Sequence, residues 1–433
     1  MHNLAHKPRI QLTSPLLPIL MGVVFIMQLV NPYRGWVILL VGLGGAWLVS
    51  TLWVRSLARN LRLRREMRFG WAQVGDQMEE RLTLYNNGWA PATWVEIVDD
   101  STLPGHTISQ VTGIGGMNTN QWHTQGMCNR RGLFTLGPTR LRTSDPFGIY
   151  ILEIDNPATR TLMVMPPIVP LPAIEVAPGG RSGEGRPRVN APERTVSSSS
   201  VRDYLPGDSL RWIHWPTTAR RGKPFVRIFD GTPAGDWRIL LDLQQDVQVG
   251  QGMDSTVEHS IILAASLADR GLHLRRAVGL AANGAELVWM PPDDSPAHRW
   301  AILRALALAE PGSTSLGTLL RNMEKDIRSH TSIILITPSL SDEWVEALLP
   351  LMWRGVTPTV LLLDPASFGG QGDTRPMLGL LTQMGVTHYI ITKDLLDRPE
   401  ARPGQAGRWE WRVSSRGKAV LVRKPGDMSW RGL

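Results

Sequence analysis

The chain has 433 residues, of which 42% are hydrophobic and 19% charged. This length exceeds the roughly 250 residues at which a single core stops growing, and the composition is typical of folded domains rather than of a disordered chain. Cys128 is the only cysteine. The sequence therefore excludes an intrachain disulfide and a structural zinc site built from cysteines.

The net charge of +8 and the isoelectric point near 10.0 raise the question of nucleic-acid binding. Residues 1–11, 55–68 and 405–433 carry net charges of +2, +5 and +5, whereas the rest of the chain carries −4. No basic stripe interleaved with aromatic residues, as in nucleic-acid interfaces, is present. The peripheral excess favours an anionic lipid surface as partner, and no nucleic acid.

The N-terminal part contains two uncharged runs, from Leu12 to Val30 and from Gly35 to Val54, separated by four residues. The 19 residues of the first run give about 28 Å of helix, close to one hydrocarbon core. A signal peptide is the alternative, but no small-residue cleavage pattern follows Val30 and a second run comes at once. We therefore predict a two-helix transmembrane hairpin over residues 12–54.

The orientation of this hairpin follows from its flanking charges. Residues 55–68 contain six arginines and residues 1–11 contain Lys7 and Arg9, whereas the link between the spans carries only Arg34. Basic residues stay on the cytoplasmic side. We expect a cytoplasmic N-terminus (1–11), a basic juxtamembrane segment (55–68) and a soluble body that faces the cytoplasm from the cytoplasmic membrane.

Residues 69–165 show short alternating segments, such as Glu79 to Leu84 and Thr93 to Val98, punctuated by Gly and Pro turns. This pattern predicts a β-sandwich-like domain. Residues 166–200 hold seven Pro, four Gly and five Ser, which predicts an extended connector.

Residues 231–433 predict an α/β domain, because apolar strands alternate with amphipathic helices. Strands are expected at 237–243, 277–280, 287–290, 332–337, 359–363 and 388–392, and helices at 257–270, 300–309 and 342–353. A last strand is expected at 418–422. Continuous apolar strands of this kind are typical of a mostly parallel, doubly wound sheet.

Residues 201–230 are dense in charged, aromatic and turn-forming residues. The residues that we single out are Arg202, Tyr204, Pro206, Gly207, Asp208, Arg211, His214, Trp215, Ala219, Arg220, Arg221 and Lys223. Pro206-Gly207 favours a tight turn, and the arginines beside Asp208 and the tryptophans favour ion pairs and cation–π contacts. Three readings remain open: a buried clamp between domains, an exposed docking surface for a partner or a phosphate, or a catalytic role. We expect Tyr204, Arg211 and Trp215 to be structural, and Arg220, Arg221 and Lys223 to dock.

The pattern Arg-x-Tyr-x-Pro-Gly-Asp, then Arg-x-Ile-x-Trp, then Ala-Arg resembles the signature of the bacterial family called domain of unknown function 58. Turns at Arg131-Gly132 and at Asp145-Pro146-Phe147-Gly148 fit the same resemblance, whereas Pro216 replaces a frequent basic residue. The resemblance implies a membrane hairpin, a β region and a C-terminal von Willebrand factor A-like domain. It also implies as partners a MoxR-type AAA+ ATPase and a transglutaminase-like membrane protein.

Domains of the von Willebrand factor A type commonly hold Mg²⁺ through Asp-x-Ser-x-Ser after the first strand, because hard oxygen ligands suit this ion. Here Asp242 matches, but Gln244 and Asp246 replace both serines, and Thr337-Pro338-Ser339 lacks the usual Thr-Asp-Gly. We therefore expect no cofactor, with Asp242 and Asp246 as the only candidate ligands if Mg²⁺ binds.

No local catalytic signature is present: the sequence has no His-Glu-x-x-His, Gly-x-Ser-x-Gly or phosphate-loop motif. Without a nucleophile at known distance, His214 is expected to be hydrogen-bonded rather than a base, and no catalytic residue is assigned. The sequence favours a non-enzymatic, membrane-tethered scaffold or adaptor that works with the ATPase in assembling or maturing membrane-associated complexes. A metal-dependent adhesion-like module is the first alternative, and a hydrolase whose site is assembled from distant residues is the second.

Overall fold

The computed structural model describes residues 7–171, 174–178, 198–204, 213–229, 236–327, 331–397, 410–413, 419–423 and 431–432. The chain divides into two compact units. The first comprises Met1–Val169, Leu303–Leu308 and Ala401–Leu433, and the second comprises Pro170–Ile302 and Ala309–Glu400. The units are described separately below.

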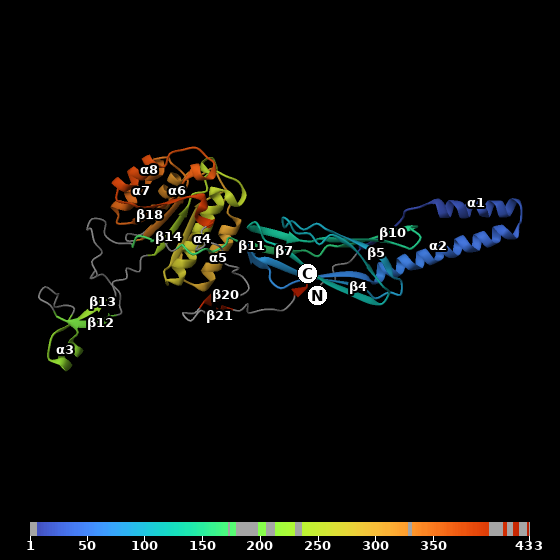
Figure 1. Ribbon diagram of the computed structural model, residues 1–433, viewed down its shortest axis with the longest axis horizontal. Coiled ribbons are helices and arrows are strands. Elements are labelled where there is room, and N and C mark those ends of the chain that lie inside the picture. Colours follow the sequence, from blue (N-terminus) through green and yellow to red (C-terminus); the bar gives the residue numbers. More distant parts are fainter. Residues whose placement is uncertain are drawn as a thin grey trace. The chain divides into compact units, whose positions relative to one another are not determined.

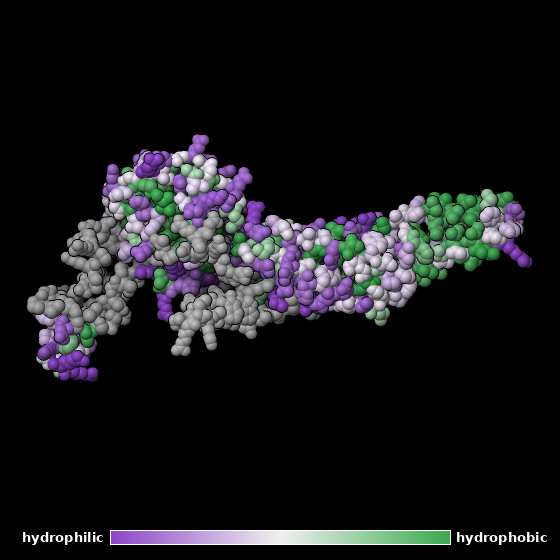
Figure 2. Space-filling model, in the orientation of Figure 1, coloured by the Kyte–Doolittle hydropathy of each residue, from purple (hydrophilic) through white to green (hydrophobic). Residues whose placement is uncertain are grey.

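The first unit opens with two apolar helices, α1 (Leu16–Val30) and α2 (Arg34–Asn60), which lie side by side (Figure 1). Their outward side chains are almost all apolar, as the space-filling view shows (Figure 2). By length and composition α2 is able to cross a membrane, whereas α1, with 15 residues, is a shorter apolar helix. An apolar surface on every side is typical of a helix that contacts lipid.

The helix bounds differ from the predicted spans. Residue Leu12 ends a strand, so α1 begins only at Leu16. At the other end α2 continues past Val54 to Asn60, because Val54 and Leu57 are buried in the core of the β domain. The last two turns of α2 are therefore part of the folded domain.

The β domain is built from a strand that precedes the two helices in the sequence and strands that follow them. The strands are β1 (Lys7–Leu12), β2 (Leu61–Met67), β3 (Trp71–Gln73), β4 (Gln77–Asn86), β5 (Ala92–Asp99), β6 (Gln110–Ile114), β7 (Asn118–Met127), β8 (Gly132–Leu136), β9 (Thr139–Ser144), β10 (Tyr150–Asn156) and β11 (Arg160–Met165). They form sheets of order β1-β10-β9-β5-β6, β22-β2-β4-β7 and β3-β11-β8. The first two sheets share one core, to which Ile97 and Leu152 contribute from one sheet and Leu63 and Leu82 from the other.

Two predicted boundaries are wrong in this region. Residues 7–12, of which 7–11 were predicted as cytoplasmic N-terminus and residue 12 as the start of the hairpin, form β1 and pair antiparallel with β10. Residues 61–67, predicted as a juxtamembrane segment, form β2 and pair along their whole length with β4. The domain therefore begins before residue 69, and cutting the chain there removes two of its strands.

The second unit contains a six-stranded sheet of order β16-β15-β14-β17-β18-β19. Its strands are β14 (Trp237–Leu241), β15 (Val278–Asn283), β16 (Leu287–Asp293), β17 (Ser332–Thr337), β18 (Thr357–Leu363) and β19 (Thr387–Ile391). All neighbouring pairs are parallel except β15 with β16. Each strand and helix predicted between residues 237 and 392 has a counterpart in the structure, and β17 has the predicted bounds, whereas helices α6 (Leu316–Met323) and α8 (Arg375–Gln383) were not predicted.

Helices cover both faces of this sheet. The helices are α4 (Thr256–His273), α5 (Pro296–Leu308), α6 (Leu316–Met323), α7 (Glu343–Trp353) and α8 (Arg375–Gln383). On one face α6, α7 and α8 bury Leu240, Leu335 and Leu362, and on the other α4 contacts β14, β15 and β17 (Figure 1). Short 3-10 turns lie at Gln245–Val247, Gly252–Asp254, Pro365–Phe368 and Lys393–Asp397.

Three further segments complete the described chain. Strands β12 (Ser198–Asp203) and β13 (Phe225–Phe229) pair around helix α3 (Trp215–Arg221). In the predicted connector, Ala177 is fixed to the α/β domain, since its N–H donates to Thr359 Oγ1 at 2.9 Å and its carbonyl accepts from Ser332 Oγ at 2.8 Å. At the C-terminus β20 (Glu410–Val413) pairs with β21 (Ala419–Arg423), and β22 (Arg431–Gly432) joins β2. The α/β domain therefore does not extend through residue 433.

Candidate functional site

The signature segment folds as a small unit in which α3 has a complete set of helix signals. His214 Nδ1 accepts a 3.2 Å hydrogen bond from the Thr217 N–H and so caps the N-terminus of the helix. Pro216 lies in the first turn, where its missing N–H costs little. Gly222 ends the helix at φ 67°, a left-handed conformation that favours glycine. The structure thus gives His214 a capping role and explains why proline fits at position 216.

Other signature residues hold this unit together or lie elsewhere. Arg202 pairs with Val226 in the β12–β13 ladder, and the half-buried Tyr204 donates its N–H to the Pro224 carbonyl at 2.9 Å. Pro206, Gly207, Asp208 and Arg211 lie outside the described residues.

The outer face of α3 is basic and solvent-exposed. Ala219, Arg220, Arg221 and Lys223 are all exposed, and the Arg221 guanidinium lies 5.4 Å from the centre of the Phe225 ring. Trp215, predicted to be structural, is instead 67% exposed. The prediction was wrong because Trp215 is the first residue of a short helix whose own side chains are not buried, so no core receives the indole.

A second polar group lies at the C-terminal end of the parallel strands. Asp242 directly follows β14 and Thr337 ends β17, which is where the strand order reverses. In open α/β sheets this switch point is the usual place for ligands. Asp242 Oδ2 accepts from Thr337 Oγ1 at 2.6 Å, and Oδ1 accepts from Gln244 N–H at 3.1 Å and from Asn283 Nδ2 at 3.2 Å.

This donor set does not fit a Mg²⁺ site. The fully buried Asp242 carboxyl has both oxygens engaged within the chain, and burial raises its pKa despite the opposing hydrogen bonds from Thr337, Gln244 and Asn283. Asp246 is exposed on a 3-10 turn. Across the described residues no group of three or more His, Cys, Asp or Glu side chains is placed to hold an ion. The geometry ties three strand ends together instead.

The β domain contains a buried charged cluster that sequence reasoning missed. Arg65 forms a two-pronged ion pair with Glu80, through Nε at 2.7 Å and Nη2 at 2.8 Å, and its Nη1 bonds Asp99 at 2.9 Å. His106 Nε2 lies 2.7 Å from Glu80 Oε2, the oxygen that also accepts from Arg65 Nη2. Burial alone would raise the pKa of Glu80, but hydrogen bonds from His106 and Arg65 outweigh it and hold the pKa below 4.5. The alternation of Leu61, Leu63 and Arg65 on one face of β2 is the signal that could have placed Arg65 inside the domain.

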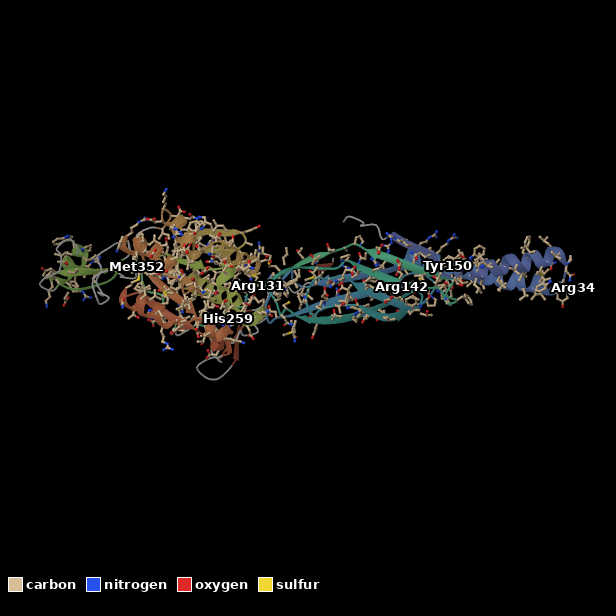
Figure 3. The ribbon with its side chains drawn as sticks, turned by 90° about the horizontal axis from the view of Figure 1, so that it is seen from above. Arg34, Arg131, Arg142, Tyr150, His259 and Met352 are labelled. Carbon is tan, nitrogen blue, oxygen red and sulfur yellow. The ribbon has the colours of Figure 1, made fainter. Side chains whose placement is uncertain are left out.

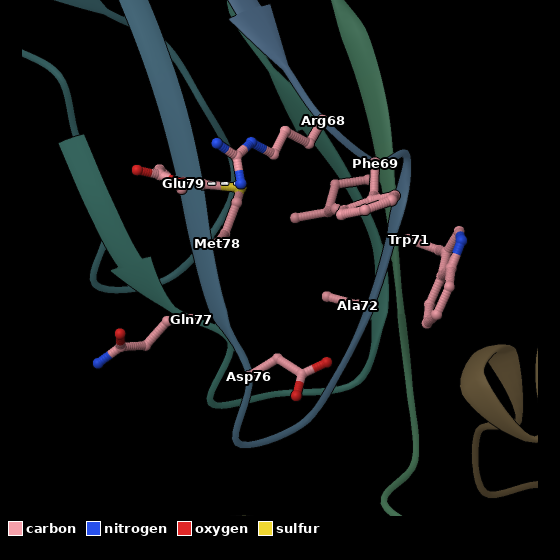
Figure 4. Close-up of a pocket in the computed structure, with 9 residues that line it drawn as sticks. Arg68, Phe69, Trp71, Ala72, Asp76, Gln77, Met78 and Glu79 are labelled. Atoms are coloured by element: carbon pink, nitrogen blue, oxygen red, sulfur yellow. Dashed lines mark ion pairs between the residues drawn. The ribbon is translucent and has the colours of Figure 1, made fainter. Parts of the chain in front are cut away.

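A pocket lies between the link that follows β2, strands β3 and β4, and β11 (Figure 4). It is lined by Arg68, Phe69, Trp71, Ala72, Asp76, Gln77, Met78, Glu79 and Leu162. Arg68 Nη1 lies 3.8 Å from Glu79 Oε2, and Asp76 Oδ2 accepts from the Gln73 N–H at 2.8 Å. These charged groups serve the local fold, so the pocket does not define a reaction or a ligand.

The architecture therefore defines a class: a membrane-associated chain in which an apolar N-terminal hairpin enters a β domain and a three-layer α/β domain follows. Residues 200–368 match the family model described as protein of unknown function DUF58. This match includes the signature segment that carries the resemblance to the family. It is also similar to the uncharacterized protein YeaD of Bacillus subtilis, with 28% identity over 112 residues, about a quarter (26%) of each chain.

Solved structures show weaker likeness. A crystal structure of an aerotolerance-related membrane protein from Bacteroides fragilis aligns with 44% of this chain and 81% of its own, at 16% identity and a TM-score of 0.24. Proximal thread matrix protein 1 from the mussel byssus aligns with 38% of this chain and 44% of its own, at 14% identity and a TM-score of 0.28.

Proposed function

We propose that the protein is a non-enzymatic scaffold or adaptor, tethered to the cytoplasmic membrane by two spans, with its β and α/β domains in the cytoplasm. Its proposed partners are a MoxR-type AAA+ ATPase and a transglutaminase-like membrane protein, in the assembly or maturation of membrane-associated complexes. One observation carries the tether: the strands before and after the helical hairpin belong to the same domain.

The positions of β1 and β2 bear on how many times the hairpin crosses the membrane. β1 precedes α1 and pairs with β10, while β2 follows α2 and pairs with β4 of the sheet that shares a core with β10. Both ends of the hairpin therefore lie on the same side of any membrane. Because α2 has the length and composition to cross, α1 must cross back, although it has only 15 residues.

Charge and aromatic residues support the orientation. Arg55 and Arg59 are exposed where α2 joins the β domain, whereas the far end of the hairpin carries only Arg34. Figure 3 shows Arg34 at the free end of the helices and Tyr150 of β10 at their base. Trp36 and Trp53 on α2 are separated by about 25 Å along the helix axis. Aromatic residues favour the two membrane interfaces and arginines favour the cytoplasmic side.

For the α/β domain we propose a von Willebrand factor A-like fold. The strand order, with β14 central and β16 antiparallel at the edge, supports this assignment. Both carboxylate oxygens of Asp242 accept hydrogen bonds from within the chain. We therefore propose that this domain presents protein-binding surfaces without using a metal. The adhesion-like and hydrolase alternatives have no specific observation in their favour among the described residues.

We assign partner docking to the exposed basic residues at the C-terminal end of α3: Arg220 and Arg221 in its last turn, and Lys223 just after it. These side chains are exposed on a unit whose cap, turn and strand pairing do not depend on them. Their replacement should therefore leave stability within about 0.5 kcal/mol while removing the charge that a partner would meet.

The test uses the full chain in detergent, with Arg220, Arg221 and Lys223 replaced by Ser, and a purified MoxR-type ATPase as the probe. The matched control replaces Arg275, Lys325 and Arg375, which are also two arginines and one lysine exposed in the second unit. We expect unchanged melting in both variants and loss of ATPase capture only in the first. Equal capture by both variants would remove α3 from the interface.

A further inference from the structure

The end of the β domain at the base of the hairpin carries exposed apolar residues on three separate loops. Trp89 is 57% exposed, Met117 77% and Phe147 60%. They come from the β4–β5, β6–β7 and β9–β10 connections, which are distant in sequence. Apolar side chains of this size gathered on loop tips indicate an interaction surface.

Hydrogen bonds and ring contacts place all three loops beside α2. The Trp89 ring packs edge-on against Trp53 of α2 at 5.3 Å, and the Met117 N–H donates to the Gly88 carbonyl at 2.8 Å. Phe147 precedes Tyr150, whose hydroxyl accepts from Trp47 Nε1 of α2 at 2.7 Å. The three tips therefore surround the point at which the hairpin leaves the domain.

The Phe147 loop is a rigid turn. The buried Asp145 accepts from the N–H of Phe147 at 3.0 Å and from that of Tyr150 at 2.6 Å, and its carbonyl accepts from Gly148 at 3.1 Å. The Asp-Pro-Phe-Gly sequence thus fixes the backbone and leaves the phenyl ring outside the fold. Because this turn holds the phenyl ring in solvent, the ring does not contribute to the hydrophobic core of the β domain.

The hairpin is too short to hold the domain away from a bilayer. On the α1 side, Thr13 is still bonded to the Ile149 carbonyl at 2.9 Å, and α1 adds about 22 Å from its 15 residues. On the α2 side, Trp47 already contacts Tyr150, so the free part of the helix, residues 34–46, spans about 20 Å. Both lengths fall short of the roughly 30 Å hydrocarbon core.

From these observations we infer that the loop tips bearing Trp89, Met117 and Phe147 insert into the lipid interface around the hairpin and seat the β domain on the bilayer. The occupant of this surface is lipid, because the tips lie at the base of the apolar hairpin, and Arg55 and Arg59, exposed on the last turns of α2, complement anionic headgroups. This inference rests on the proposed membrane tether and deepens it, since it fixes the height of the domain.

The test places an environment-sensitive fluorophore on single cysteines of the full chain, reconstituted in vesicles of phosphatidylethanolamine and phosphatidylglycerol that contain nitroxide-labelled lipid. Met117→Cys and Phe147→Cys report the tips. Met127→Cys is the matched control, because Met127 is also exposed and ends strand β7 about 30 Å from Met117. The unmodified chain gives the background, since Cys128 is fully buried.

We expect lipid quenching at positions 117 and 147 to exceed that at 127 about threefold, because interfacial groups lie roughly 5–10 Å into the headgroup boundary. Val23→Cys, in α1, reports the hairpin itself. If position 23 is quenched but positions 117 and 147 are quenched no more than position 127, the inference is overturned and the membrane tether stands. If position 23 is not quenched, the membrane tether itself is overturned. Blue-shifted but unquenched tips would mean that a protein, such as a second copy of the chain, covers this surface and would also overturn the inference.

Discussion

Trp47 Nε1 donates a 2.7 Å hydrogen bond to the hydroxyl of Tyr150, which also lies 3.3 Å from Thr51 Oγ1. The bond joins α2 to the first residue of β10, which in turn pairs with β1. The hairpin and the β domain are thus fixed to each other at the level where we place the membrane surface.

Replacing Tyr150 by Phe should loosen this junction. The change removes the acceptor of the Trp47 N–H and should cost about 1 kcal/mol. Hydrogen exchange of the full chain in detergent should become faster around residues 47–54. Tyr85→Phe is the control, since no hydrogen bond of the Tyr85 hydroxyl is found among the described residues. Equal exchange in the two variants would show that the bond does not fix the junction.

Glu80 should be a main stabiliser of the β domain. Glu80→Gln leaves Arg65 buried with Asp99 alone, and breaking a buried pair costs about 3–5 kcal/mol. Glu79→Gln, one residue away, weakens only a half-buried pair and should cost less than about 1 kcal/mol. Chemical unfolding of both variants measures the difference, and similar losses would contradict the role of the cluster.

The same cluster predicts the pH dependence of stability. The pKa of Glu80 is lower in the folded protein than its ordinary value of 4.5. Its contribution to the free energy of unfolding is therefore present above pH 4.5 and is lost as the pH falls through the folded pKa. Melting temperature measured between pH 6 and 3 should fall less steeply for Glu80→Gln, and parallel curves would speak against this account.

Asp242 should behave in the opposite sense. Because its pKa is raised above 3.8 in the fold, its contribution to stability is fully present below pH 3.8 and is lost as the pH rises through the folded pKa. At neutral pH, Asp242→Asn should therefore be at least as stable as the parent, whereas Asp242→Ala should lose about 1–3 kcal/mol by leaving Asn283 and Gln244 without their acceptor. An Asn variant as unstable as the Ala variant would contradict this.

Calorimetry with Mg²⁺ tests the same residue independently. We expect weak or no binding, because Gln244 and Asp246 replace the two serines of the von Willebrand factor A pattern and both Asp242 oxygens already accept hydrogen bonds. Micromolar affinity for Mg²⁺ that Asp242→Ala abolishes would show that the loop rearranges into a metal site.

The α/β domain was predictable because its signals are local. An apolar run such as 332–337 reads as a buried strand whatever its neighbours, and the structure gives it the same bounds. The short helices α6 and α8 were missed, since a helix of eight or nine residues shows too few turns for a clear period. The strand order of the α/β domain, by contrast, could not be predicted, because it depends on which strands pair in the folded structure.

The errors in the β domain have a different cause. Residues 7–12 pair with residues 150–155, and nothing within a six-residue segment reveals a partner so far along the chain. Arg65 was grouped with its basic neighbours, because burial of an arginine depends on where Glu80 and Asp99 lie in space. The composition of a segment indicates only its average environment. The pairing of β1 with β10 and the ion pairs of Arg65 depend instead on individual residues that are distant in sequence.

The central claim is that the hairpin crosses the membrane twice and leaves the β and α/β domains in the cytoplasm. It is tested most directly by labelling single cysteines with a membrane-impermeant maleimide in intact spheroplasts and after lysis, with Tyr33→Cys at the tip of the hairpin and Met127→Cys in the β domain. We predict that position 33 is labelled in intact spheroplasts and that position 127 is labelled only after lysis. Labelling of position 127 in intact spheroplasts, or protection of position 33 until lysis, would contradict the account.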